Sequence, residues 1–241
     1  ANLLMEVVKL SIALYSVVSN GLWHEVMAVD RSTALALGAT NLMYAFNNNL
    51  MHYSYGALPP AIFIIAINSL RTILTSIFQY LVSGKSLLPR QVVACVLLVL
   101  SFVSSSYADI IGVIANGHFS GSQFALLLLL SSIYSSVSVS ASLTQEKLLK
   151  EAPHVMVCNV INYSFGIVLQ LSGVIFLKVA KGDPVFRGFQ IWWVWLIPIL
   201  FALNGLSISF ILKHFDNIIK LFCSCLVVLI IHTLTAYLES E

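Results

Sequence analysis

Long apolar runs fill most of the chain and are separated by short polar joints. A helix that crosses a bilayer needs about 20 mostly apolar residues. Eight segments are of this kind: residues 1–19, 33–55, 58–82, 89–110, 122–143, 155–178, 190–212 and 216–238. No joint between them is long enough for a soluble domain. The pattern therefore predicts an all-α polytopic membrane protein in which residues 1–241 form a single transmembrane domain.

The composition supports a membrane protein and excludes several other classes. Hydrophobic residues make up 59% of the chain, charged residues only 9%, and the mean hydropathy is +0.94. Charged residues are too few to cover the surface of a water-soluble protein. The lipid bilayer must therefore solvate most of the surface of this one. The net charge of +2 and the lack of a basic cluster give no reason to expect nucleic acid as a partner. The six histidines have no ligand spacing, and we expect neither a metal nor a cofactor.

Arg71 is a cation deep inside the apolar run from Ala57 to Val82. Such a charge costs roughly 2.5–3.5 kcal/mol at a helix centre on insertion scales. We therefore expect Arg71 to face a polar cavity that receives an anion. Lys220, near the start of the last apolar run, is either a second cation in that cavity or a side chain that extends to the membrane surface.

Amides and a phenol within the spans are candidates for contact with a nucleoside. Asn47, Asn48 and Asn49 are about 100° apart on a helix, so they cannot all face one partner. We expect one of them to line a cavity, and the alternative is hydrogen bonding between helices. Asn159 and Tyr163 are four residues apart and share one helix face. They could read a base edge or a ribose, or Tyr163 could be a packed tyrosine with a satisfied hydroxyl.

Glu6 and Lys9 are two oppositely charged residues within the first apolar run. They are three residues apart on a predicted helix, so they can neutralise each other and lower the free energy of burial. The sequence leaves open whether they form a structural ion pair or contact a substrate.

A weak internal similarity suggests a repeated architecture. The segment Tyr44–Asn48 in the second span is similar to Phe201–Gly205 in the seventh, and each is followed by a span that carries a cation. An odd number of spans per repeat inverts the second copy, which is a common construction of secondary transporters with a site between the repeats. We therefore predict a first repeat over residues 1–110 and a second over residues 122–238.

Four motifs together resemble those of a known family. They are Glu6–Leu10, Tyr44–Asn49, Gln145–Lys150 and Asn204–Lys220, and the last contains the string Asp-Asn-Ile-x-Lys that ends at Lys220. They resemble motifs of the nucleotide-sugar transporters of solute carrier family 35, nearest to the branch of CMP-sialic acid and UDP-galactose transporters and its probable UDP-sugar members. The resemblance covers essentially the whole chain and keeps the motif order.

The resemblance implies a ten-helix protein of the drug/metabolite transporter superfamily, with several passes through the Golgi or endoplasmic reticulum membrane. Such proteins are antiporters, not enzymes, and exchange a cytosolic nucleotide sugar for a lumenal nucleoside monophosphate. Here a pyrimidine nucleotide, a UDP sugar, is the expected substrate, and a homodimer is one assembly left open. The chain corresponds to helices two to nine of the family, so each repeat lacks one outer helix.

The family's nucleotide-binding pattern carries over to six residues of this chain. Arg71 takes the place of a lysine, which keeps the charge and adds a bidentate grip on phosphate. The expected substrate-binding residues are Arg71, Lys220, Asn48, Asn49, Asn159 and Tyr163.

Two positions depart from the family pattern. Ile64 stands where a tyrosine is expected, and Phe165 stands where a small polar residue is expected. Together with the two helices that have no counterpart, they define an alternative function, a non-transporting membrane scaffold or truncated paralogue. An intramembrane enzyme is not expected, because no acid, base or nucleophile within the spans has a suitable partner.

Overall fold

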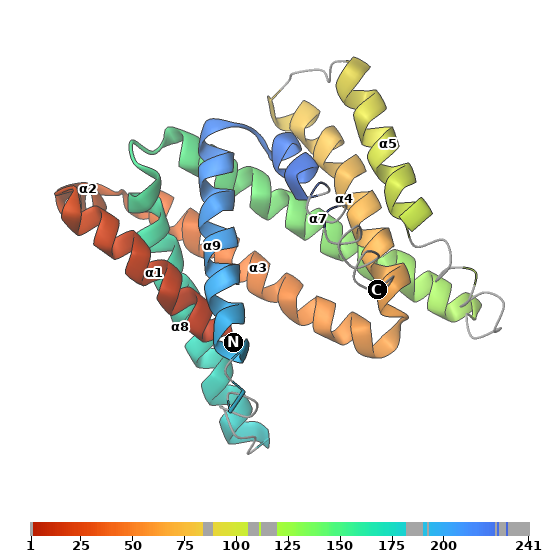
Figure 1. Cartoon of the computed structure of the whole chain (residues 1–241), viewed down its shortest axis with the longest axis horizontal. Coiled ribbons are helices and arrows are strands. Elements are labelled where there is room, and N and C mark those ends of the chain that lie inside the picture. Colours follow the sequence, from red (N-terminus) through yellow and green to blue (C-terminus); the bar gives the residue numbers. More distant parts are fainter. Residues whose placement is uncertain are drawn as a thin grey trace, which may run out of the picture. The chain divides into compact units, whose positions relative to one another are not determined.

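The computed structural model describes residues 2–83, 89–105, 111, 120–181, 190–191, 193–224, 226 and 230. Every regular element in these ranges is an α-helix, which confirms the predicted fold class (Figure 1). The chain divides into two compact units, one of Ala1–Ala45 with Thr144–Asp216 and one of Phe46–Leu143 with Asn217–Glu241. Each unit takes residues from both predicted repeats, and the repeat boundaries themselves stay a prediction.

The described helices follow the predicted spans closely. They are α1 (Asn2–Ser19), α2 (Trp23–Ala28), α3 (Arg31–Ala57), α4 (Pro60–Ser83), α5 (Pro89–Ser105), α7 (Gly121–Glu151), α8 (Val155–Lys181) and α9 (Trp193–His214). Residues 217–224 are also helical, and most of the predicted span 216–238 lies outside the described residues.

Five of the described helices hold a stretch that is long and apolar enough to cross a membrane. These stretches are Asn2–Ser19, Ile62–Leu81, Gly121–Glu151, Val155–Phe176 and Val194–His214. The apolar part of α5, Pro89–Ser101, is shorter. The predicted span 33–55 forms α3, which has the length but is more polar than the five.

Helix α7 continues well beyond the predicted end of its span at residue 143. Lys150 Nζ lies 2.6 Å from Glu146 Oε1, and Lys147 Nζ lies 3.9 Å from Glu151 Oε1. Both pairs are four residues apart, a spacing that stabilises a solvated helix. The joint between the fifth and sixth spans is therefore helical up to Glu151 and shorter than the polar residues suggested.

Asp30 caps the start of α3. Its Oδ2 accepts hydrogen bonds from the backbone N–H groups of Ser32, at 3.0 Å, and Thr33, at 3.2 Å. This satisfies donors that have no partner within the helix. Hydrogen bonds from the side chain and the backbone of Thr33 also lower the pKa of the Asp30 carboxyl. The carboxylate therefore stays charged at neutral pH, next to the positive end of the helix dipole.

The core of the first unit is formed where α1, α8 and α9 lie side by side (Figure 1). Its buried apolar residues are Ala13, Val17, Val157, Val160, Tyr163 and Leu206. Two glycines keep the helices close around the charged residues of α1. A Cβ at Gly166 would lie 2.7 Å from Glu6 Oε2, and a Cβ at Gly205 would lie 3.1 Å from Lys9 Cδ.

We expect Gly166→Ala to destabilise the protein. The buried Glu6 carboxylate is held by Lys9 and cannot move away from a new methyl group without weakening that ion pair. Overpacking of this kind typically costs about 1–3 kcal/mol. Gly173→Ala, on the same helix with open space around its Cβ position, is the matched control and should be neutral or slightly stabilising. Equal melting temperatures for the two variants would contradict the expected clash.

The core of the second unit joins the end of α3, the first half of α4 and the start of α7. Phe63, Ile67, Leu127 and Leu130 are buried together, and the Phe63 ring meets the Tyr134 ring edge to face at 6.2 Å between centroids. Ser135 Oγ donates to the backbone carbonyl of Ile67 at 3.1 Å. These contacts fix the register of α4 against α7, and Arg71 lies one turn after Ile67 on α4.

Candidate functional site

Arg71 and Lys220 line one small polar cavity in the second unit. The cavity has a volume of about 20 Å³ and is lined by Arg71, Thr75, Ser138, Val139, Ser142, Asn217, Lys220, Leu221 and Ser224. This is room for about one water molecule. The structure thus brings together the two cations that the sequence singled out in apolar runs.

Arg71 has a neutral partner and an unused donor. Its Nη2 donates to Asn68 Oδ1 at 3.0 Å, one turn earlier on α4. Its Nε is buried and has no hydrogen-bond partner. The same is true of Thr75 Oγ1, and Thr75 lines the same cavity. A buried polar atom without a partner costs about 1–3 kcal/mol. An oxygen-rich anion or an ordered water in the cavity would satisfy these atoms.

Lys220 is held by a short chain of hydrogen bonds. Its Nζ donates to Ser142 Oγ at 2.8 Å, and Ser142 Oγ donates to Asn217 Oδ1 at 2.6 Å. Ser142 and Asn217 are both buried. Because the single hydroxyl proton of Ser142 goes to Asn217, its lone pairs are free to accept from the ammonium of Lys220. The arrangement positions the ammonium at the edge of the cavity.

Ser142 is a site residue that the sequence analysis missed. Ser131, Ser135, Ser138 and Ser142 are all buried on α7 and are spaced by four, three and four residues, which is one helix face. The spacing of these four serines could have been detected in the sequence. Other serines lie between them, so the pattern did not stand out.

The three consecutive amides of α3 point in different directions, as their spacing of about 100° requires. Asn48 and Asn49 are exposed, and Asn47 is buried. Asn47 Nδ2 donates to the backbone carbonyl of Tyr134 at 3.3 Å, and its Oδ1 is buried with no partner. Asn47 therefore makes the hydrogen bond between helices that was the alternative interpretation. The roles of Asn48 and Asn49 stay a prediction.

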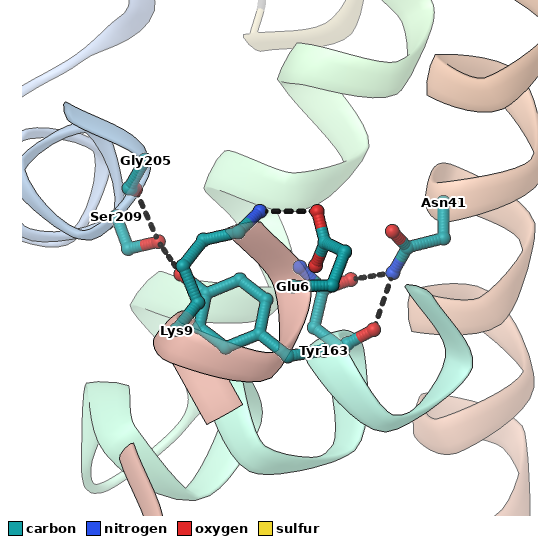
Figure 2. Close-up of polar contacts among 7 residues, drawn as sticks. Glu6, Lys9, Asn41, Tyr163, Gly205 and Ser209 are labelled. Carbon is teal, nitrogen blue, oxygen red and sulfur yellow. Dashed lines mark hydrogen bonds and ion pairs between the residues drawn. The ribbon is translucent and has the colours of Figure 1, made fainter. Parts of the chain in front are cut away.

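Asn159 and Tyr163 lie together on the buried face of α8 in the first unit. The Tyr163 hydroxyl is 3.4 Å from Ser209 Oγ on α9 (Figure 2). Asn159 Nδ2 is 3.9 Å from Met156 Sδ, a weak contact, and its Oδ1 is buried without a partner. Asn159 thus carries an unused hydrogen-bond acceptor in the apolar interior, which is unusual for a purely structural amide.

Glu6 and Lys9 form a buried ion pair beside Tyr163. Lys9 Nζ lies 2.5 Å from Glu6 Oε1 and 4.7 Å from the centroid of the Tyr163 ring (Figure 2). The two residues are only 6% and 8% exposed. The contacts are those of a structural pair, in which the carboxylate and the aromatic ring both stabilise the ammonium.

The same region contains a polar contact that the sequence did not indicate. Asn41 Nδ2, from α3, donates to both the backbone carbonyl and Oδ1 of Asn162 on α8 (Figure 2). Polar bonds of this kind between membrane helices are worth about 0.6 kcal/mol on average. The contact fixes α3 beside the face of α8 that carries Tyr163.

The two departures from the family pattern have different surroundings. Ile64 is partly exposed on α4. The Phe165 ring packs against α3 at Gly38, where a Cβ would lie 3.1 Å from Phe165 Cε1. A bulky residue is accommodated here because the opposite position is a glycine.

The fold and these residues define a polytopic α-helical membrane protein with two half-buried cations at a polar cavity. The chain belongs to the nucleotide-sugar transporter family, because the family model with that description matches residues 3–239. This confirms the family resemblance. The family is one of transporters, which agrees with the expectation that the chain is not an enzyme.

Individual relatives give the same result. A probable UDP-sugar transporter protein SLC35A4 of Xenopus tropicalis is 31% identical over 75% of this chain and 56% of its own length. A protein of the same name from Danio rerio is 30% identical over 91% of this chain and 69% of its own length. A UDP-N-acetylglucosamine transporter of Homo sapiens is 27% identical over 90% of this chain and 67% of its own length. The chain therefore spans between 56% and 69% of these relatives.

Proposed function

We propose that this chain acts in an antiporter that exchanges a cytosolic pyrimidine nucleotide sugar for a lumenal nucleoside monophosphate. The membrane is that of the Golgi or the endoplasmic reticulum, and the substrate is a UDP sugar. One observation carries the proposal: Arg71 and Lys220 line the same cavity within an apolar membrane protein. The names of the relatives, which refer to UDP sugars and UDP-N-acetylglucosamine, support the choice of nucleotide.

The phosphates are the part of the substrate that the two cations recognise. Two like charges on one cavity of low dielectric constant repel each other. An anion bound between them attracts both, so the net electrostatic energy becomes favourable. The Arg71 guanidinium has a free Nε donor next to an Nη2 that is bonded only to a neutral amide. A guanidinium fork matches two phosphate oxygens. Lys220 supplies a point charge whose position is set by Ser142.

The nucleoside is assigned to the amides and the phenol. Asn159 Oδ1 is a buried acceptor without a partner, and the uracil ring offers an N–H donor of matching polarity. The Tyr163 hydroxyl, which now contacts Ser209, is suited to a ribose hydroxyl. Asn48 and Asn49 are the other two nucleotide-binding residues that the family pattern implies.

The cavity must widen before a nucleotide can bind. Ligand sites are usually about 300–1,000 Å³, and the space beside Arg71 and Lys220 is about 20 Å³. Substrate entry therefore separates the helices that line this space. The free energy for that separation comes from pairing the two half-buried cations with phosphate. An empty carrier therefore changes state less readily than a loaded one.

Uptake by proteoliposomes that contain the purified full-length protein tests this function. We expect uptake of a UDP sugar to rise several-fold when the vesicles contain UMP, to rise less with CMP, and not to rise with AMP, because the site is built for a pyrimidine. Equal uptake into empty and UMP-loaded vesicles would contradict exchange. No uptake under any condition, with normal folding, would favour the scaffold or truncated paralogue.

A further inference from the structure

A second cavity, with a basic rim, lies in the first unit. It has a volume of about 520 Å³ and is lined by Ser16, Asn20, Leu22, Pro153, His154, Val155, Met156, Phe210, Lys213 and His214. None of these residues belongs to the predicted substrate-binding set. We propose that this cavity binds the phosphate headgroup of an anionic phospholipid.

The position of the cavity is that of a membrane surface. Three stretches able to cross a membrane have one end there: Asn2–Ser19 and Val194–His214 end beside it, and Val155–Phe176 begins there. A lipid headgroup lies at this depth, where the apolar part of each span gives way to polar residues. Basic pockets between membrane helices at this level are typical of sites for anionic headgroups.

The polar side of the cavity offers donors and positive charge. Lys213 Nζ donates to the backbone carbonyls of Lys150, at 3.4 Å, and of Ala152, which uses two of its three N–H bonds. His154 and His214 are exposed at the rim, and His154 Nε2 is 3.7 Å from Glu25 Oε1. Val155 and Met156 are in the first turn of α8, where backbone N–H groups have no partner within the helix and attract anions.

The other side of the cavity is apolar, which favours a lipid over a soluble phosphate compound. Leu22, Met156 and Phe210 line it. The Phe210 side chain is exposed. An acyl chain attached to a phosphate in the cavity would cover such a surface and remove it from water.

The proposal is tested by thermal unfolding of the purified full-length protein in a neutral detergent. The probes are dioctanoyl phosphatidic acid, dioctanoyl phosphatidylcholine and inorganic phosphate, each over a range of concentrations. A ligand that binds only the folded protein raises the melting temperature as its concentration rises. We expect phosphatidic acid to do so at far lower concentration than the other two probes. Equal effects of inorganic phosphate and phosphatidic acid would show a site for free phosphate and overturn the proposal, as would equal effects of the two lipids.

Two variants assign the effect to this cavity. Lys213→Gln should weaken the apparent affinity for phosphatidic acid about fivefold or more. His154→Gln with His214→Gln, which removes two imidazole groups from the rim, should weaken it as well. The histidine variant leaves the bonds of Lys213 to the carbonyls intact, so it separates lipid binding from folding. Lys147→Gln is the control, because it removes one positive charge from a side chain that is 72% exposed and outside the cavity. Unchanged affinity in both test variants would overturn the proposal.

Discussion

The variant Arg71→Ala of the full-length protein is expected to lose most of its affinity for UMP. Arg71 supplies a charge and a buried, unused Nε donor at the cavity that it shares with Lys220. Hydrogen bonds to charged groups contribute about 1.5–3 kcal/mol each, so the loss of one or two such bonds weakens binding by roughly 10- to 100-fold or more. The measurement is the dissociation constant for UMP, from calorimetry or from the ligand-dependent rise in melting temperature.

Three controls make this result specific for phosphate recognition. Arg71→Lys keeps the charge and loses the fork, so it should bind UMP with intermediate affinity. Uridine lacks the phosphate, and its weak binding should be similar in the original protein and in Arg71→Ala. Lys147→Ala removes an exposed cation and should bind UMP normally. If Arg71→Ala folds and binds UMP as the original protein does, the cations have no role in recognition and the proposed transport loses its physical basis.

The second large effect is on stability and concerns the ion pair of α1. We expect Lys9→Met to lower the free energy of unfolding by about 3–5 kcal/mol, because it leaves the Glu6 carboxylate buried without its cation. The loss includes the contact of the ammonium with the Tyr163 ring, at 4.7 Å. Thermal unfolding in detergent, or protection against proteolysis, measures the change.

A double replacement separates the ion pair from its surroundings. Glu6→Leu with Lys9→Met removes both charges and should recover most of the lost stability, since apolar replacement of a complete buried pair is often neutral or better. Lys147→Met breaks an exposed pair and should change the unfolding free energy by less than about 1 kcal/mol. If Lys9→Met impairs transport with no loss of stability, Glu6 and Lys9 contact the substrate and the structural interpretation is wrong.

The sequence predicted the helices well wherever lipid determines their length. Residues 1–19, 58–82 and 155–178 correspond to α1, α4 and α8 within a few residues. It failed where helices continue into water. The end of α7, with the pair of Lys150 and Glu146, is stabilised by local charge, and a search for apolar runs cannot detect it. The short helix α2 was missed because its six residues are too few for a search for membrane-length apolar runs.

The candidate site was predictable only in part. Arg71 and Lys220 are conspicuous because a cation in an apolar run needs a physical explanation. Ser142, Asn68 and Asn217 are not conspicuous, because small polar residues are common in membrane helices and become site residues only through a contact on another turn or helix. Sequence spacing gives the neighbours within one helix, but it does not give the partner across the bundle.

The intrahelical pairing of Glu6 with Lys9 has a consequence for biogenesis. Both charges lie on α1, one turn apart, so the segment is electrically neutral before α8 and α9 are made. Synthesis reaches Gly166 on α8 and Gly205 on α9 more than a hundred residues later. Helix α1 can therefore partition from the translocon into lipid without waiting for its partners, and α8 and α9 then close around a pair that is already formed.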